Sequence, residues 1–392
     1  MQSMCAHSLR GCKLITAQCW RHQARRAVAT QAAVNNAGTS KKRVVFMGTP
    51  EVAAIVLEEL LLASQQQGAS FEVAAVVSQP GKPKGRGNKG LPTPSPVEQL
   101  ARQHNMPNEA ILCPRSAKEP AFLEAMRAMQ PDLAITAAYG NMLPTAFLNI
   151  PKHGVLNIHP SLLPQYRGAA PVQRAVQDGV ATTGVSVAFT VLKCDAGPIY
   201  MQEEAAVLED EQAPELLNRL FKQGAQLLVG NLERVWSGEA AQLAQQQDEA
   251  QATHAAKLAK EEAQLDFQQP ARVLHNKVRA YAGWPGTFAV LKVSSSSSSS
   301  GSGDDANQQL QQQQHFQVKV LRSRVGDAAA EQVVKAAPAG QVVFADSGKR
   351  MLLPCADGSV LEVLQLQPPT KKAMEPKAFY NGLSGKQLTV SP

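Results

Sequence analysis

Apolar residues in the first half of the chain gather into short runs that alternate with longer segments of helical periodicity. Residues 43–47 read RVVFM, end at the turn-forming Gly48-Thr49-Pro50, and precede a helix-like segment at residues 51–63. Further apolar runs lie at residues 72–77, 132–136, 155–158 and 184–190. Because strands that alternate with helices build parallel sheets, this half predicts an α/β domain with a doubly wound, Rossmann-like parallel sheet over residues 42–235.

The pattern changes after a polar, Gln-rich tract at residues 238–249, which we interpret as part of a linker over residues 236–252. Short apolar runs separated by turn residues then follow at residues 287–293, 316–320, 340–344, 351–353 and 360–366. Such spacing predicts a smaller antiparallel β-barrel or sandwich, OB-like, over residues 253–392. Residues 294–315 begin with seven consecutive serines and cannot bury apolar surface, so we expect a disordered insertion there.

The first 40 residues differ in composition from the rest of the chain. They contain Arg and Lys at five positions, many Ala, Gln and Ser residues, and no Asp or Glu. A basic, acid-free segment without a compact apolar run is typical of an organellar transit peptide rather than a secretory signal, although a plain disordered extension has similar features. We therefore expect residues 1–40 to direct import into a mitochondrion or, as the alternative, a plastid.

Composition and charge limit the remaining possibilities. A chain of 392 residues with 44% hydrophobic residues can bury a large core in two or three domains, and no run approaches the roughly 18 apolar residues of a membrane-spanning helix. The whole chain has a formal net charge of +7. Without residues 1–40, 34 basic residues remain against 32 acidic ones, so most of the excess positive charge lies in that segment. Residues 253–392 hold 16 basic against 11 acidic residues, an excess that suits an anionic partner but does not establish one.

The cysteines argue against a disulfide framework or a zinc site. Three of the six lie in the first 40 residues, and the others, Cys113, Cys194 and Cys355, are widely separated. We expect these three to be buried thiols, and we expect no bound metal.

The densest group of reactive side chains follows the apolar run at residues 155–158. Asn157 and His159 alternate with apolar residues, so both side chains point to one face at the end of a strand, where α/β sheets bind ligands. Asp195 follows another predicted strand. Taken singly, an Asn-x-His pair is commonly structural and an Asp before Gly commonly forms a turn. Together, an amide, an imidazole and a carboxylate suit acyl transfer to an acceptor that supplies its own amine.

A basic loop is predicted at residues 79–97, where Lys82, Lys84, Arg86 and Lys89 lie among Gly and Pro. This loop is either a solvated surface segment or a contact to an anionic partner. Residues 48–54 read GTPEVAA and lack the G-x-G-x-x-G spacing of a dinucleotide site, which argues against an NAD-dependent oxidoreductase. We expect Trp284 to be a core anchor rather than a base-stacking platform, and we leave open whether Lys371-Lys372 forms a solvated turn or a nucleic-acid contact.

The segments NIHPSLLPQYRGAAPVQRA, CDAGPI, VVFMGTPEVA and AYGNMLP closely resemble the folate-dependent formyltransferases. Within that superfamily, QPGKPKGRGNKGLPTPSPV, AKLAKEEAQLDF and RAYAGWPGTFA resemble the methionyl-tRNA formyltransferase family in particular, in an organellar form. The resemblance covers residues 42–390 apart from the Ser-rich insertion. It implies transfer of a formyl group from 10-formyltetrahydrofolate to the α-amino group of methionyl initiator tRNA, for organellar translation initiation.

The resemblance also implies roles for individual residues. Asn157, His159 and Asp195 match the catalytic positions of the family. The segment matching its folate contacts is Ser161-Leu162-Leu163-Pro164, and the basic residues matching its tRNA contacts are Lys84, Arg86 and Lys89. Many bacterial relatives carry a second acidic residue where this chain has Pro198, so we assign no second carboxylate. We expect folate and initiator Met-tRNA as partners, no membrane, and a monomer.

Two alternatives remain beside this reading. One is an enzyme with the same catalytic residues that acts on glycinamide ribonucleotide, an amino sugar nucleotide or water instead of tRNA. The basic loop and the basic second domain favour the tRNA acceptor, since a small acceptor needs neither. The other is a non-catalytic RNA-binding protein on the same fold, and retention of Asn157, His159 and Asp195 argues against it.

Overall fold

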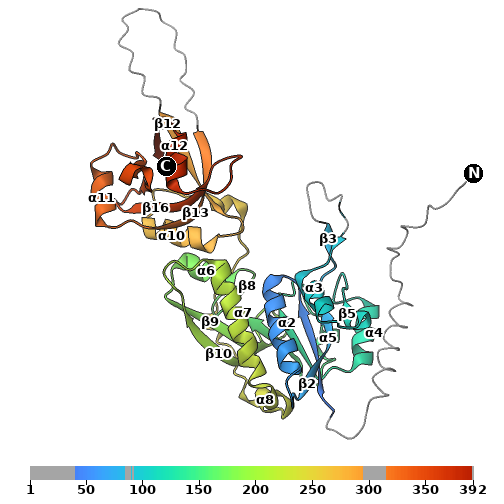
Figure 1. Cartoon of the computed structure of the whole chain (residues 1–392). Helices are drawn as coiled ribbons and strands as arrows, with labels where there is room; N and C mark the ends of the chain where they lie inside the picture. The colour runs from blue at the N-terminus through green and yellow to red at the C-terminus, as the bar shows by residue number, and fades with distance from the viewer. Residues whose placement is uncertain (1–39, 84–89, 91, 295–314, 391–392) are drawn as a thin grey trace, which may run out of the picture. The chain divides into compact units, whose positions relative to one another are not determined.

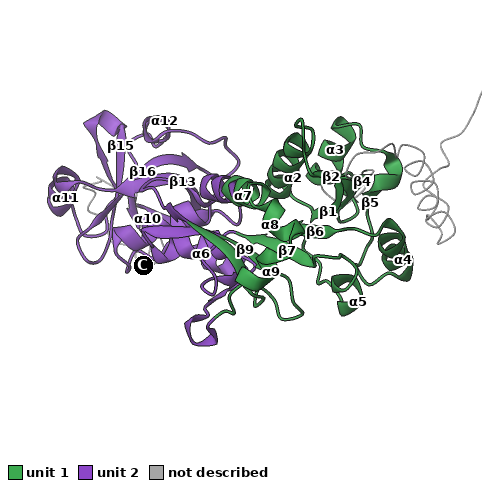
Figure 2. Ribbon diagram, turned by 90° about the horizontal axis from the view of Figure 1, so that it is seen from below, with its two compact units in different colours: residues 1–159, 186–203, 221–247 green, residues 160–185, 204–220, 248–392 purple. Residues whose placement is uncertain are grey.

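The computed structural model describes residues 40–83, 90, 92–294 and 315–390. These residues belong to two compact units (Figure 2). Unit 1 comprises residues 1–159, 186–203 and 221–247, and unit 2 comprises residues 160–185, 204–220 and 248–392. The expected transit peptide up to residue 39, the loop residues Lys84, Arg86 and Lys89, and residues 295–314 of the expected insertion lie outside the described residues.

Seven strands of the described chain form one sheet in the order β10-β9-β7-β6-β1-β2-β5, and Figure 1 labels β10, β9, β2 and β5 of these strands. Their bounds are β1 Lys42–Gly48, β2 Phe71–Val77, β5 Ile111–Leu112, β6 Leu133–Ala137, β7 Val155–His159, β9 Thr182–Phe189 and β10 Ile199–Ala206. From β5 to β7 neighbouring strands pair in parallel, which confirms the expected Rossmann-like class. The apolar run that forms β9 instead pairs antiparallel with β7, because the chain re-enters the sheet at the edge where β7 ends.

Helices connect these strands, and α2 packs on β1, β2 and β6. Their bounds are α2 Glu51–Ser64, α3 Pro96–Gln103, α4 Pro120–Met129, α5 Thr145–Leu148, α6 Pro171–Asp178, α7 Ala213–Val229, α8 Leu232–Trp236 and α9 Glu239–Leu243. Single-turn helices and two-residue strands complete this part: η1 Asn108–Ala110, η2 Glu249–Gln251, β3 Lys82–Pro83, β4 Pro92–Thr93, β8 Arg167–Gly168 and β11 His254–Ala255. Proline occupies the first turn of α3, α4 and α6, where its missing N–H costs no hydrogen bond.

The core of unit 1 explains why its strands read as continuous apolar runs. On β1, Val45 and Met47 pack in one cluster with Phe122 of α4 and Phe147 of α5, while Val44 and Phe46 of the same strand are also fully buried. A strand covered on both faces needs no polar alternation. The first strand was therefore readable from the sequence.

Unit 2 contains a six-stranded sheet in the order β14-β15-β16-β13-β12-β17, with every pairing antiparallel in the described residues. The strand bounds are β12 Thr287–Ser294, β13 His315–Val325, β14 Val343–Ala345, β15 Arg350–Pro354, β16 Val360–Gln367 and β17 Gln387–Val390. The accompanying helices are η3 Lys260–Ala263, α10 Ala271–Ala280, α11 Ala328–Lys335, η4 Asp346–Gly348 and α12 Pro376–Gly382. This curved antiparallel sheet agrees with the expected barrel-like class.

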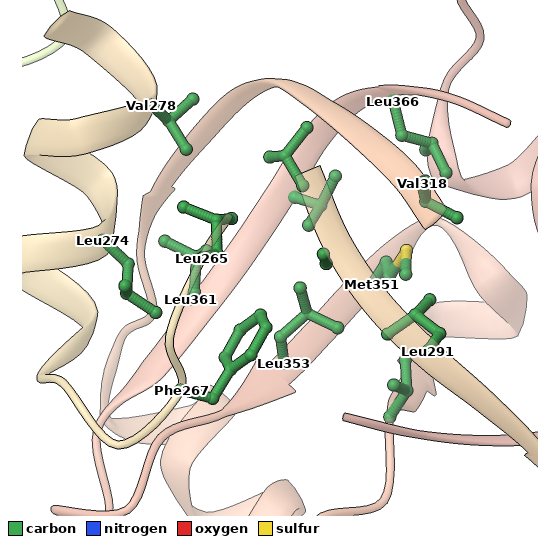
Figure 3. Close-up of a cluster of buried hydrophobic side chains, with 14 of the residues drawn as sticks. Leu265, Phe267, Leu274, Val278, Leu291, Val318, Met351, Leu353, Leu361 and Leu366 are labelled. Carbon is green, nitrogen blue, oxygen red and sulfur yellow. The ribbon is translucent and has the colours of Figure 1, made fainter. Parts of the chain in front are cut away.

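One apolar cluster holds the second sheet against α10. Figure 3 shows Leu274 and Val278 of α10 beside Leu361 of β16, Leu353 of β15 and Phe267. All five side chains are buried. Burying a side chain of this size contributes about 1.5–3 kcal/mol, so the cluster supplies much of the stability of the unit.

Two expectations about burial are wrong. Trp284 is 49% exposed rather than a core anchor, because it lies in a turn between Gly283 and Gly286, both at positive φ. Tyr281 of the same motif is the fully buried ring. Cys194 is exposed, and of the three described cysteines only Cys355 is fully buried.

Two features are absent from the described residues. No helix there is long and apolar enough to cross a bilayer. No group of three or more His, Cys, Asp or Glu side chains there could hold a metal ion.

The motif AKLAKEEAQLDF contains a carboxylate that ties three segments of unit 2 together. Both oxygens of Glu262 accept hydrogen bonds from Arg174 of α6, at 2.7 and 3.0 Å. The Tyr281 hydroxyl and the Ala259 N–H donate to the same carboxylate, at 2.9 and 2.8 Å. The hydrogen bonds from Arg174 above all, followed by those from Ala259 and Tyr281, outweigh burial and lower the pKa of Glu262 to about 2.

We predict that Glu262→Gln lowers the free energy of unfolding by about 1–2 kcal/mol at neutral pH, a figure discounted for the partial exposure of this side chain. Since the folded pKa is depressed, the stabilisation exists above pH 4.5 and is lost as pH falls toward 2. Urea unfolding from pH 7 downward should show the wild-type advantage shrinking below pH 4.5. Glu261→Gln, at the exposed neighbouring position, is the control. Equal stability of Glu262→Gln and wild type at neutral pH would contradict the assignment.

Candidate active site

Asn157 and His159 lie two residues apart on β7, so their side chains point to the same face of the sheet. His159 is only 4% exposed, while Asn157 is partly exposed. β7 lies between β6 and β9, and both neighbours are hydrogen-bonded to it. The strand is thus held from two sides, which fixes the positions of both side chains.

Thr136 orients the amide of Asn157. The two residues are direct partners in the β6–β7 pairing, and the Thr136 hydroxyl donates to Asn157 Oδ1 at 2.8 Å. An amide whose oxygen accepts this bond directs its nitrogen, the donor end, away from β6. Thr136 was not predicted as a site residue from the sequence. Its only signal there is that it is the one polar residue of the apolar run LAITA.

Asp195 reaches the same site from the loop after β9. Its Oδ1 lies 3.8 Å from Nδ1 of His159, an ion-pair separation that is longer than a hydrogen bond. The three residues predicted to be catalytic, Asn157, His159 and Asp195, are therefore brought together in unit 1.

The backbone of the Asp195 loop is constrained by its own sequence. Asp195 adopts φ +49°, a left-handed conformation that Asp tolerates better than most residues. A Cβ at Gly197 would collide with the carbonyl oxygen of Phe189, so only glycine fits there. The Phe189 N–H donates to the carbonyl of Pro198 at 2.9 Å and closes the loop. The sequence Asp195-Ala196-Gly197-Pro198 therefore favours this turn.

Cys194, beside the catalytic candidate, remains a thiol. Its Sγ donates to Asp195 Oδ2 at 3.4 Å. Although the residue is exposed, partial desolvation of its sulfur by neighbouring atoms, and then the negative charge of Asp195, raise the pKa of Cys194 to about 11. A thiol with so high a pKa is a poor nucleophile, which argues against Cys194 as an attacking group.

Three strand-end loops are cross-linked at the carboxyl ends of β1, β2 and β6. The Tyr139 carbonyl accepts from Thr49 Oγ1 at 3.0 Å and from Gln79 Nε2 at 3.1 Å. A Cβ at Gly140, which has φ +80°, would lie 2.6 Å from Gln79 Nε2. The side chains of Thr49 and Gln79 therefore tie the loops after β1 and β2 to the loop after β6.

The segment Ser161-Leu162-Leu163-Pro164 belongs to unit 2, although it follows His159 almost directly in the chain. Ser161 is fully buried, and its hydroxyl donates to the carbonyl of Gln165 at 2.7 Å. Leu163 is buried as well, while Leu162 and Pro164 are partly exposed. The segment thus presents apolar side chains on a backbone fixed by its own hydrogen bond. Lys84, Arg86 and Lys89, the remaining predicted site residues, lie outside the described residues.

Two family models match the chain, one described as formyl transferase over residues 42–232 and one as formyl transferase, C-terminal domain, over residues 257–384. A methionyl-tRNA formyltransferase from Thermus thermophilus is 38% identical over 332 residues, which cover 85% of this chain and 93% of the relative. A methionyl-tRNA formyltransferase from Thermotoga maritima is 41% identical over 249 residues, or 64% of this chain and 75% of the relative.

Among solved structures, an N-formyltransferase from Helicobacter canadensis in complex with folinic acid and dTDP-3-aminofucose superposes with a TM-score of 0.51. The two sequences are 14% identical, and the superposed region covers 84% of this chain and 100% of the Helicobacter canadensis chain. At this identity the likeness concerns the fold alone. The sequence relatives, the two matched domains and the fold agree, and the chain belongs to the methionyl-tRNA formyltransferase family of enzymes.

Proposed function

We propose that the protein transfers a formyl group from 10-formyltetrahydrofolate to the α-amino group of methionine on initiator tRNA, in an organelle. The observation that carries this proposal is the site in which Thr136 directs the Asn157 amide nitrogen, with His159 on the same strand face and Asp195 3.8 Å from the imidazole. Membership of the formyltransferase family supplies the reaction class.

The residues suit attack by a neutral amine on a formyl carbon. As the new C–N bond forms, the formyl oxygen gains negative charge, and the Asn157 amide together with an N–H of His159 can donate to it. The amine must lose a proton while the folate nitrogen, as the leaving group, gains one. Asp195, beside His159, orients the imidazole during this transfer.

The donor is proposed from the resemblance of residues 161–164 to the folate-contacting segment of the family. Leu162 and Pro164, which are partly exposed, offer apolar side chains suited to a flat heteroaromatic ring. 10-Formyltetrahydrofolate would supply the activated formyl group. The folinic acid bound by the Helicobacter canadensis enzyme is a related folate and supports this choice of donor.

The acceptor is proposed from the relatives and from charge. Relatives at 38% and 41% identity are methionyl-tRNA formyltransferases, and the 16 basic against 11 acidic residues of residues 253–392 suit an anionic acceptor. We assign contacts with the acceptor stem to Lys84, Arg86 and Lys89. We also propose that the enzyme acts as a monomer.

The cellular location is proposed from residues 1–40 alone. Their basic, acid-free composition suits import into a mitochondrion, or alternatively a plastid, where formylated methionine would initiate translation.

We predict that the full-length protein transfers labelled formyl from 10-formyltetrahydrofolate to charged initiator tRNA, and that His159→Ala lowers turnover by about 10²- to 10³-fold. His104→Ala, at the end of α3, is the control and should retain wild-type turnover. Transfer to a small amine or to water, with none to Met-tRNA, would retain the reaction class and refute the acceptor. Full activity of His159→Ala would refute the assigned site.

Thr136 provides a finer test of the amide orientation. Thr136→Val keeps the shape of the side chain but removes the donor, and we predict a fall in kcat of roughly tenfold with little change in KM. Thr136→Ser restores the hydroxyl and should recover most of the activity. Equal kinetics for the Val and Ser variants would show that the hydroxyl does not orient Asn157.

The proposed location has a separate test. Residues 1–40 fused to a fluorescent protein should accumulate in mitochondria when expressed in the source cells, or in plastids under the alternative. A fusion in which Arg10, Arg21, Arg25 and Arg26 are changed to Glu should remain in the cytosol, because import depends on the basic residues. Cytosolic fluorescence of the unchanged fusion would refute the transit peptide.

A further inference from the structure

The Gln-rich tract interpreted from the sequence as a linker makes specific contacts in unit 1. Gln245 forms an antiparallel bridge with Ile199, the first residue of β10, through hydrogen bonds of 2.8 and 2.9 Å in both directions. The tract therefore runs alongside the end of the loop that carries Asp195.

Gln247 extends this pairing with its side chain. Its Nε2 donates to the carbonyl of Asp195 at 2.8 Å and to the carbonyl of Gly197 at 2.7 Å. One amide nitrogen thus uses both of its protons to hold two backbone oxygens of a single turn. Gln247 lies 52 residues from Asp195 in sequence, so the contact is made only in the folded chain.

The Asp195 loop depends on such polar contacts because it has little packing to hold it. Val191, Leu192, Lys193 and Cys194 are all exposed. Asp195 itself adopts a left-handed conformation at φ +49°, which costs free energy unless neighbouring contacts maintain it. The two hydrogen bonds from Gln247 act on either side of Ala196 and oppose relaxation of this turn.

We propose that Gln247 is a positioning residue for Asp195, so that the tract before residue 248 sets the geometry of the catalytic loop. Gln247 acts on the reaction through the Asp195 backbone. The kinetic part of this inference rests on the proposed formyl transfer, whereas its structural part does not. It implies that losing the Gln247 amide slows turnover without weakening the binding of Met-tRNA.

The test compares Gln247→Met, which keeps the length of the side chain but lacks both donors, with Gln246→Met at the exposed neighbouring position. Losing two hydrogen bonds should lower kcat by roughly 10- to 100-fold, with KM for Met-tRNA unchanged. In an Asp195→Ala background, Gln247→Met should cause little further loss, because it acts through the residue already removed. A fall in kcat that is undiminished in that background would overturn the proposed route.

A charged variant supplies a pH signature. In Gln247→Glu the ionised carboxylate faces two carbonyl oxygens and repels them, while its protonated form regains one donor. The deficit of Gln247→Glu relative to Gln247→Met should therefore shrink as pH falls. A ratio of the two activities that stays constant with pH would count against direct contact with these carbonyls.

Deuterium uptake over residues 190–198, measured by mass spectrometry on the full chain, gives a readout without activity. Uptake should be faster in Gln247→Met and unchanged in Gln246→Met. Wild-type uptake in Gln247→Met, or faster uptake with unchanged kcat, would overturn the positioning role. If wild type fails to formylate Met-tRNA, the proposed function fails by itself, and the uptake comparison still decides whether Gln247 holds the loop.

Discussion

The site depends above all on the pairing of β6 with β7 at Thr136 and Asn157. The parallel register places a hydroxyl against an amide oxygen at 2.8 Å, and this contact determines which end of the amide faces the reacting groups. If the amide were reversed, its oxygen, which cannot donate a hydrogen bond, would face the formyl oxygen that gains negative charge. The same strand also positions His159, which lies two residues further along and points to the same face of the sheet.

Asp195 is held by a different kind of structure. Asn157 and His159 are fixed by the backbone hydrogen bonds of β7 to its neighbouring strands. The Asp195 loop relies instead on Gly197, where a Cβ would not fit, on the left-handed conformation of Asp195 and on two hydrogen bonds from Gln247. A polar loop of this kind can adjust when substrates bind, which suits its separation of 3.8 Å from the imidazole. The site thus joins two rigid groups to one adjustable group.

The sequence predicted those parts whose cause is local. β1 was readable because both of its faces are buried, and Asn157 and His159 because alternation places them on one face. Features that depend on contacts between residues far apart in the sequence were predicted wrongly or not at all. The burial of Tyr281 in place of Trp284 depends on Glu262 and on the glycine turn, and Gln247 was indistinguishable from its neighbours in a Gln-rich tract. Nothing in the spacing could show that β9 returns antiparallel.

The arginines of unit 2 show why a net charge is a weak guide to nucleic-acid contact. Within residues 253–392 every arginine is already engaged: three pair with Glu215 or Glu362, Arg272 pairs with Glu209, and Arg279 donates to backbone carbonyls and to Asn276. The exposed pairs among them, such as Arg322 with Glu215, contribute little free energy, so a phosphate could replace the carboxylate there, whereas Arg279 is buried. The lysines of these residues would bind phosphates as point charges without base-specific geometry. A net charge therefore does not show which cations a tRNA would reach, and the planar donor of Arg86 in the basic loop is better suited than a lysine to reading unpaired bases.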